Sequence, residues 1–406
     1  METRLHEMDR RTFIKTAAAG TLALAQTQVA LGGGGALEAV RPQYRGPNVI
    51  VVRWGGGARR SESIEPASTY APFLTHELIP RGILFPRMEI AQFEGLQTSH
   101  GEGTLNLLTG KYDRYQDIGV ERPDAHHKFL GARFEAKVPT LFEYLRGAFD
   151  VADHQALLVN GEDRSDEEFY NFSNHHLFGV RYRSQTLSLR RYKTWLLRRN
   201  LAAGRWEGKE LEKRRHEFEQ LSALDYRVDK EAGQGPVIDG FWERWRSYYG
   251  ENGLVNPRGD RLLTELSIRA IRELRPRLLM VNYQDCDYVH WGYMDHYTRA
   301  VAIMDEGMKS LVAAVDADLE YRGNTVFIVV PDCGRDNNPF VDVPCQHHFN
   351  SRSAHEIFAL VFGTGVSRGR VVDRLTDQTS VAGTVGAFMG FKAGQADGGV
   401  LEEAFA

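Results

Sequence analysis

The sequence predicts an α/β protein, a three-layer α/β/α sandwich built on a mostly parallel central sheet. Two continuous apolar runs, Asn48–Val52 and Thr325–Val330, have the pattern of strands that are buried on both faces. Such strands alternate along the chain with segments of helical spacing, an order that favours a parallel sheet covered by helices on both sides. The length of 406 residues fits one large α/β domain with an insertion.

The other elements are expected from the same two patterns. Short apolar runs predict strands at Gly82–Phe85, Met88–Ile90, Ala156–Asn160, Leu278–Val281 and Ile357–Phe362. Helical spacing and helix-start residues predict helices at Phe73–Leu78, Thr140–Arg146, Arg261–Leu274, Tyr297–Val315 and Thr379–Met389. The stretch Gly101–Tyr112 is expected to begin as a loop and to become a short helix that Gly110 ends.

Composition narrows the class of protein. A formal net charge of −4 gives no electrostatic reason to expect nucleic acid as a partner. The three cysteines are too few for a disulfide framework, and the number is odd. Residues 161–256 are charged, aromatic and mostly helical in pattern. We therefore expect them to form a helical insertion or cap over the sheet of a domain that spans residues 41–406.

The first 40 residues have the pattern of an export signal rather than of a folded element. One residue separates Arg10 and Arg11 from the triplet Phe-Ile-Lys, and a weakly apolar run, Thr16–Leu31, follows. This order resembles a twin-arginine signal, which the twin-arginine export machinery reads on folded proteins. The run is too short and too polar for a stable membrane span. We therefore expect an exported protein, periplasmic or extracellular.

Residues with metal-binding chemistry gather after two of the expected strands. Asp285, Asp287 and His290 follow the run Leu278–Val281 within a few residues. A second set follows Thr325–Val330 and consists of Asp332, Cys333, Arg335, His347 and His348. Open α/β sheets bind ligands beside the carboxyl ends of their strands, so the two stretches are expected to form two walls of one metal pocket. Aspartate and histidine suit Zn²⁺, Mn²⁺ or Fe with a position open for water.

Two ligand choices stay open in this pocket. Asp285 either replaces Asp287 as the ligand or orients His290 through a hydrogen bond. One of His347 and His348 is expected to bind the metal and the other to have a structural role, with His348 preferred.

The order of the motifs resembles the alkaline-phosphatase superfamily, which includes sulfatases and metal-dependent phosphodiesterases. The matching stretches, in chain order, are Asn48–Val52 with the glycines after it, Leu107–Gly110, Asp287 with His290, Asp332–Gly334, and His347 with His348. The resemblance implies a binuclear metal site, with a nucleophile at the start of the helix that ends in the Leu-Thr-Gly motif. It covers residues 47–110 and 261–391, and it does not place the segment between them.

Three departures alter the site nearest the expected nucleophile. Members of the superfamily hold one metal with an aspartate after the first strand, and this chain has Gly55 at or near that position. The nucleophile lies nine residues before the threonine of the closing motif, and counting back from Thr109 reaches His100. Cys333 stands where a histidine is usual, and it is either a ligand or a small buried side chain.

The missing hydroxyl at position 100 leaves the nucleophile open. Ser99, Ser61 and Thr104 are the available hydroxyl groups, and His100 itself could react through a phosphohistidine. Attack by a water activated at the metal is the simpler chemistry.

A second, softer metal site is also compatible with the sequence. His100, Asp332 and Cys333 would supply it, because thiolate and imidazole are both good Zn²⁺ ligands. Arg335, just after this stretch, is the arginine that we expect to hold an anionic oxygen of the substrate.

The resemblance implies an exported, metal-dependent hydrolase of small phosphate or sulfate esters. The cofactor would be one or two divalent ions, with Zn²⁺ expected and Mn²⁺, Fe or Ca²⁺ as alternatives. A catalytically impaired relative that binds a metal or an anion is a second hypothesis, and a phospho- or sulfo-group transferase is a third. The sequence predicts neither the substrate nor the oligomeric state.

Overall fold

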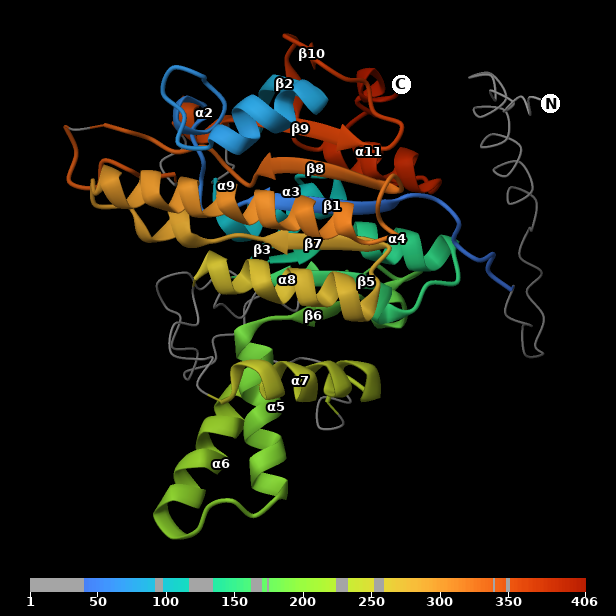
Figure 1. The fold of residues 1–406 in the computed structure, drawn as a ribbon, viewed down its shortest axis with the longest axis vertical. Helices are drawn as coiled ribbons and strands as arrows, with labels where there is room; N and C mark the ends of the chain where they lie inside the picture. The colour runs from blue at the N-terminus through green and yellow to red at the C-terminus, as the bar shows by residue number, and fades with distance from the viewer. Residues whose placement is uncertain are drawn as a thin grey trace. The chain divides into compact units, whose positions relative to one another are not determined.

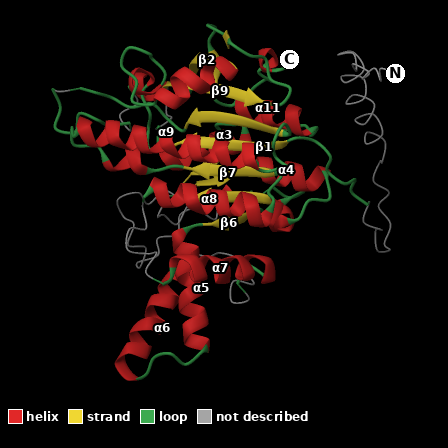
Figure 2. Ribbon diagram, in the orientation of Figure 1, coloured by secondary structure: helices red, strands yellow, loops and turns green. Residues whose placement is uncertain are grey.

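A nine-stranded sheet forms the centre of the fold (Figures 1 and 2). The structure, a computed structural model, describes residues 40–91, 98–116, 134–161, 170–173, 175–223, 233–251, 259–338, 340–347 and 351–406. Residues 1–39 of the predicted export signal lie outside this set. Among the described residues, no helix combines the length and the apolar character that a membrane crossing needs.

The strand order of the sheet is β10-β2-β9-β8-β1-β7-β5-β6, with β11 also paired to β2. The bounds are β1 (Asn48–Trp54), β2 (Gly82–Glu89), β5 (Ala156–Asn160), β6 (Gln185–Leu187), β7 (Leu278–Asn282), β8 (Thr325–Pro331), β9 (Glu356–Gly363), β10 (Arg370–Val371) and β11 (Thr376–Asp377). Strand β9 runs antiparallel to β2 and β8, and the other pairings described in this sheet are parallel. The mostly parallel sheet is therefore confirmed. A separate antiparallel pair joins β3 (Arg114–Gln116) and β4 (Phe134–Ala136).

Helices cover both faces of the sheet, as Figure 1 shows. On one face lie α8 (Asp260–Leu274) and α9 (Met294–Ala317), and on the other lie α3 (His100–Thr109), α4 (Leu141–Ala148) and α11 (Ser380–Met389). The shorter helices are α2 (Arg60–Ser63), η1 (Phe73–Leu78), η2 (Ile79–Arg81), η3 (Asp153–Gln155), η5 (Gly179–Tyr182), η7 (Asp285–Tyr288), α10 (Arg352–His355) and η8 (Glu402–Ala404). The predicted three-layer sandwich is confirmed.

Strand β1 explains why the sheet has a hydrophobic core on each side. Its side chains alternate between two clusters of buried residues, with Ile50 and Val52 in one and Val49 and Val51 in the other. A strand that is buried on both faces favours a continuous run of apolar side chains, which is the pattern that predicted β1.

Two local boundaries differ from the sequence prediction. The two predicted strand pieces around residue 86 form the single strand β2, with a bulge between Phe85 and Met88. Helix α3 begins at His100, where a loop was expected, because the Ser99 hydroxyl accepts a hydrogen bond from the Glu102 N–H at 3.3 Å and caps the first turn. Gly110 ends this helix in the left-handed conformation, as predicted.

The described part of the predicted insertion, residues 161–256, contains three long helices, which lie beyond one edge of the sheet rather than over a face. Helices α5 (Leu189–Ala202), α6 (Gly208–Ala223) and α7 (Pro236–Tyr249) lie beyond the edge strand β6 (Figure 1). Strand β6 belongs to the same segment and pairs in parallel with β5. Because this strand extends the sheet, α5, which follows it, starts at the sheet edge rather than above a face.

Candidate metal centre

The carboxyl ends of β1, β7 and β8 meet at one edge of the sheet, and polar residues gather there. Arg53, near the end of β1, lies between Asn282 of β7 and Val330 of β8 in the strand register. Asp287 lies in η7, which follows β7, and Asp332 directly follows β8. The predicted convergence of two strand ends is therefore present.

Helix α3 brings His100 to the same edge. The helix packs closely on the end of β8 because it carries a glycine there, and a Cβ at Gly103 would lie only 2.2 Å from the backbone oxygen of Asp332. His100 is the first residue of this helix, and its side chain is fully buried.

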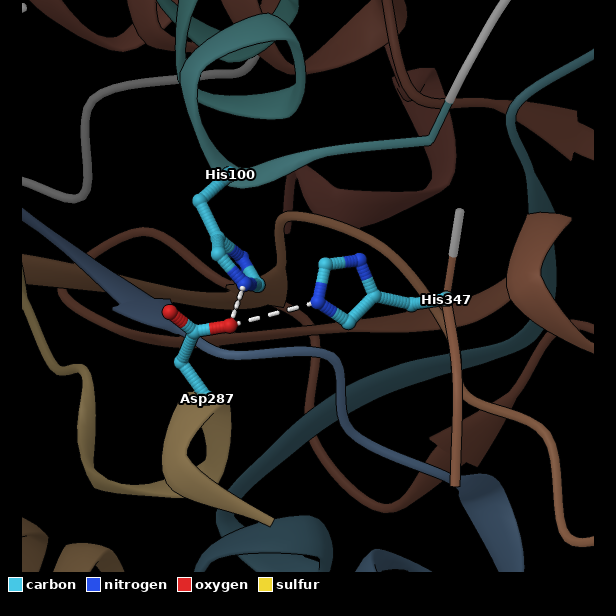
Figure 3. A group of neighbouring side chains, drawn as sticks. All are labelled: His100, Asp287 and His347. Atoms are coloured by element: carbon cyan, nitrogen blue, oxygen red, sulfur yellow. Dashed lines mark hydrogen bonds and ion pairs between the residues drawn. The ribbon is translucent and has the colours of Figure 1, made fainter. Parts of the chain in front are cut away.

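Three imidazoles converge on one carboxylate oxygen. From Oδ1 of Asp287, the Nε2 atoms lie at 2.5 Å for His100, 3.1 Å for His290 and 3.3 Å for His347. Figure 3 shows His100 and His347 pointing at this oxygen from separate segments of the chain. The ligand atoms of His100, Asp287 and His347 all lie within 4.8 Å of one another. His290 is the most exposed of the four side chains, at 21%.

Neighbouring groups fix the orientation of these rings. The Nδ1 atom of His100 lies 2.7 Å from Oδ2 of Asp332, and that of His347 lies 3.2 Å from the backbone oxygen of Thr98. Carboxylate and carbonyl oxygens can only accept, so each Nδ1 carries the hydrogen and each ring presents Nε2 to Asp287. Metal-binding histidines are typically held in this way, with the second ring nitrogen donating to a carboxylate or a carbonyl.

The spacing of the ligand atoms fits a small divalent ion. With Zn–N distances of about 2.0–2.1 Å, neighbouring ligand atoms of a tetrahedral site lie about 3.3 Å apart. The separations from Asp287 to His290 and His347, 3.1 and 3.3 Å, already have this value. The 2.5 Å contact between His100 and Asp287 is a hydrogen bond, and it would open by roughly 1 Å around an ion.

The charges at this edge are balanced without an ion. Burial alone would lower the pKa of His100, but the carboxylates of Asp287 and Asp332 raise it well above its ordinary value. Burial would raise the pKa of Asp287, but the charged His100 ring holds it well below its ordinary value. The proton on Nε2 of His100 therefore occupies the position that a metal would take, and metal binding would release it.

A second group of possible ligands surrounds Asp332. The ligand atoms of His100, Asp332 and Cys333 also lie within 4.8 Å of one another. The guanidinium of Arg53 lies 3.5 Å from the Asp332 carboxylate, and both side chains are fully buried. Burial raises the pKa of the Cys333 thiol to about 12, and a thiolate is the form that binds metal.

Most of the predicted ligands lie close together in the structure. Asp287, His290 and His347 lie together as expected, and His100 joins them as well as the Asp332 group. The preferred ligand His348 lies outside the described residues, and His347 is the member of the pair whose ring is described at this edge.

Asp285 and Arg335 have other contacts. Asp285 accepts a hydrogen bond at 3.2 Å from the N–H of Asp260 at the start of α8, and it lies in neither of the described groups of ligand atoms. The buried guanidinium of Arg335 donates to five backbone carbonyls, those of Gly56, Gly57, Cys286, Val289 and Cys345. These bonds tie together the loops after β1, β7 and β8. The expectation that Arg335 holds a substrate oxygen is therefore corrected to a structural role.

Two positioning residues escaped the sequence analysis. Arg53 donates from Nη2 to Oε1 of Gln284 at 2.8 Å, and Gln284 donates from Nε2 to Oδ2 of Asp287 at 2.9 Å. This chain of hydrogen bonds links the carboxylates of Asp287 and Asp332 through one arginine. The only sequence signal was a charged residue inside the apolar strand β1, where Arg53 follows four aliphatic residues.

Solved structures with the same fold are known. The alkaline phosphatase PafA matches with a TM-score of 0.54 and 11% identity, over 89% of this chain and 99% of PafA. A PafA variant with four substitutions matches over the same shares, with a TM-score of 0.53 and 10% identity. This chain has the fold of the alkaline-phosphatase superfamily.

The likeness to PafA confirms the fold that the order of the motifs predicted. A 2-O GAG sulfatase is also similar, with a TM-score of 0.49 and 11% identity over 88% of this chain and 74% of the sulfatase. No family model and no curated protein sequence matches the chain. At these identities the likeness defines the fold, and the chemistry has to be argued from this chain's own residues.

Proposed function

We propose that this protein is a metal-dependent hydrolase of small phosphate or sulfate esters. The observation that carries the proposal is the convergence of three imidazole Nε2 atoms on Oδ1 of Asp287, at the carboxyl edge of the sheet. In α/β folds of this kind, that edge is where ligands bind. PafA, which has the same fold, is an alkaline phosphatase, so phosphate esters are the first substrates to test.

His100, Asp287, His290 and His347 would hold the ion in this proposal. A divalent ion there would polarise the ester and lower the pKa of a water molecule to near neutrality. Asp332 would keep the His100 ring in place through Nδ1, and the Thr98 carbonyl would do the same for His347.

The side chains favour water as the attacking group. Both ring nitrogens of His100 are held by carboxylates, which argues against a phosphohistidine. The Thr104 hydroxyl donates to the backbone oxygen of His100 at 2.6 Å and is buried, and the Ser61 hydroxyl donates to Glu62 at 2.6 Å. Ser99 remains the one candidate hydroxyl beside His100, where it caps α3.

The test is metal-dependent turnover by the purified protein. After removal of metal with a chelator, Zn²⁺ or Mn²⁺ should restore hydrolysis of an aryl phosphate, an aryl phosphodiester or an aryl sulfate. Asp287→Asn should abolish both metal binding and turnover, whereas Ser99→Ala should retain turnover if water attacks directly. Turnover that survives in Asp287→Asn, or that needs no metal, would refute the proposal.

A second candidate function is metal binding without catalysis. It is favoured by one observation: the first residue of α3, where the superfamily resemblance predicts the nucleophile, is a histidine locked between two carboxylates. Stoichiometric metal in the wild type with no turnover of any ester in the panel would support this candidate over the hydrolase.

Export is a further part of the proposal, supported by the sequence alone. The pair Arg10 and Arg11 before a weakly apolar run is typical of a twin-arginine signal. Replacement of both arginines by lysine should retain the protein in the cytoplasm of a host with this pathway. Unchanged export of the double variant would argue against the assignment.

A further inference from the structure

Two groups of ligand atoms lie side by side at the sheet edge, and they share His100. The first combines His100 with Asp287 and His347, and the second combines it with Asp332 and Cys333. His100 faces them through opposite ring nitrogens, Nε2 for the first and Nδ1 for the second. The surroundings of the two carboxylates decide how many ions the edge can hold.

The carboxylate of Asp332 is already surrounded by donors. Its Oδ1 accepts from the N–H of the next residue at 2.8 Å and from the N–H of Gly57 at 3.2 Å. Its Oδ2 accepts from His100 at 2.7 Å and from the N–H of Gly56 at 3.4 Å, and Arg53 lies at 3.5 Å. A carboxylate offers about four acceptor positions, so Asp332 has no need of a metal to satisfy it.

The glycine turn after β1 makes this arrangement possible. Gly56 and Gly57 have φ values of 92° and 76°, which place their N–H groups toward Asp332. A Cβ at Gly56 would lie 2.4 Å from the backbone nitrogen of Asp287, so a larger residue would push apart the loops after β1 and β7. Successive N–H groups that point at one anion form a binding concavity, and here it holds a side chain of the protein itself.

The guanidinium of Arg53 is fixed in position. It donates to the Thr104 hydroxyl at 2.5 Å, to the Tyr283 backbone oxygen at 3.0 Å and to Gln284 Oε1 at 2.8 Å. The side chain is 0% exposed. It therefore cannot turn away from Asp332 to make room for a second positive charge.

A guanidinium and an imidazole differ in whether they can coordinate a metal ion. A neutral imidazole has a lone pair on one ring nitrogen, so the rings of His100, His290 and His347 can coordinate a cation through Nε2. The guanidinium of Arg53 stays protonated and has no lone pair to offer. A divalent ion on Asp332 would therefore lie beside a permanent, buried positive charge, whereas an ion on Asp287 would not.

We propose that this protein binds one ion, at Asp287 with its three imidazoles, and that the guanidinium of Arg53 takes the place of a second ion at Asp332. The inference rests on the metal centre proposed above and adds the number of ions and a role for Arg53. Arg53 is a positioning residue: its fixed charge holds Asp332, and Asp332 holds the ring of His100. The binuclear site that the superfamily resemblance implies does not fit the residues around Asp332.

Metal stoichiometry tests the proposal. The full-length protein is stripped with a chelator, reloaded with excess Zn²⁺, freed of unbound ion, and measured by elemental analysis beside Cys333→Ser. One ion per chain is expected in both proteins, because Cys333 belongs only to the group around Asp332. Two ions in the wild type with one in Cys333→Ser would overturn the proposal. One ion in the wild type with none in Cys333→Ser would also overturn it.

The absence of any ion in the wild type would have a different consequence. It would refute the metal centre itself, and with it the proposed hydrolase function. Two ions would leave the hydrolase intact and overturn only the replacement by Arg53.

A cobalt spectrum supplies a second readout that is independent of activity. Co²⁺ bound to a thiolate has an intense sulfur-to-metal charge-transfer absorption, and Co²⁺ bound to nitrogen and oxygen alone has none. No such band is expected in the wild type. A band that disappears in Cys333→Ser but persists in Cys345→Ser, whose thiol instead contacts the sulfur of Met294 at 3.5 Å, would overturn the proposal.

Discussion

Two buried aspartates contact the same imidazole ring in opposite surroundings. Asp287 follows β7 and Asp332 follows β8, the two strands that flank β1, and each accepts a hydrogen bond from one nitrogen of His100. Around Asp332 the other partners are backbone N–H groups and the guanidinium of Arg53. Around Asp287 they are two more imidazoles and the amide of Gln284.

The difference lies in the source of the positive charge, not in the charge of the carboxylates. Burial would raise the pKa of both, but His100 lowers it at both sites, and Arg53 adds to that effect at Asp332, so both stay ionised. The positive charge of a guanidinium is permanent, so a carboxylate that it neutralises stabilises the fold. Imidazoles can exchange protons for a metal, and a carboxylate that they surround can serve a ligand.

The largest effect is expected where a ligand is removed. His290→Ala should lower metal affinity by more than about 100-fold, beyond the range that loss of a supporting hydrogen bond produces. The fold should persist, because the His290 side chain is 21% exposed and lies outside the tightest group of ligand atoms. Elemental analysis and turnover measure the loss. His296→Ala, an exposed histidine on α9, is the matched control and should keep the ion. Equal metal content in both variants would remove His290 from the centre.

The next largest effect is expected on stability, at Arg53. Arg53→Met keeps the length of the side chain but removes the buried guanidinium, which leaves the charged His100 ring to compensate both Asp287 and Asp332, and this should lower the free energy of unfolding by about 3–5 kcal/mol. Urea unfolding of the metal-free protein measures it. Asp332→Asn in the same chain should recover part of the loss, because only one buried carboxylate, that of Asp287, then faces the charged His100 ring. Additive losses in the double variant would show that the two side chains are not coupled.

A smaller effect is expected when Asp332 alone is changed. Asp332→Asn can still accept a hydrogen bond from His100 but no longer carries the charge that holds the ring, so metal affinity should fall by about 10- to 100-fold. The number of ions should stay the same. A titration with a fluorescent Zn²⁺ chelator measures the affinity, and Asp285→Asn is the comparison variant with no change expected. Loss of the ion altogether would make Asp332 a ligand.

Most of the fold could be predicted from the sequence because it depends on local patterns. The apolar runs at Asn48–Val52 and Thr325–Val330 are strands β1 and β8, and the alternation with helices indicated the layer order. Strand β6, within the segment 161–256, was not predicted because it has only three residues and its pairing with β5 is a tertiary contact. Sequence periodicity carries no information about which edge such a short strand joins.

The candidate site could be predicted only in part, because its side-chain contacts are tertiary and the local sequence does not determine them. Asp287 and His290 were visible because metal ligands after a buried strand have a recognisable pattern. The partners of Arg53 and Arg335 were not visible, since an arginine side chain can reach several loops and its sequence neighbours do not say which. Arg335 was expected to bind a substrate and instead bonds to backbone carbonyls. Arg53 lies inside the core and is paired with Asp332.

The smallest effect is expected for an arginine–carboxylate pair at the surface, which has the same two chemical groups as Arg53 and Asp332. Arg374 holds Glu403 through two contacts of 2.6 and 2.9 Å, but the two side chains are 48% and 28% exposed. The hydrogen bonds from Arg374 lower the pKa of Glu403 from 4.5 to about 2, so the pair stabilises the fold above about pH 4.5 and loses that contribution as the pH falls toward 2. Solvent screening limits its value, and Glu403→Gln should lower the free energy of unfolding by less than about 1 kcal/mol at pH 7 and by less still at pH 4. Urea unfolding at the two pH values measures both. A loss as large as that of Arg53→Met would show that burial is not what makes the Arg53–Asp332 pair strong.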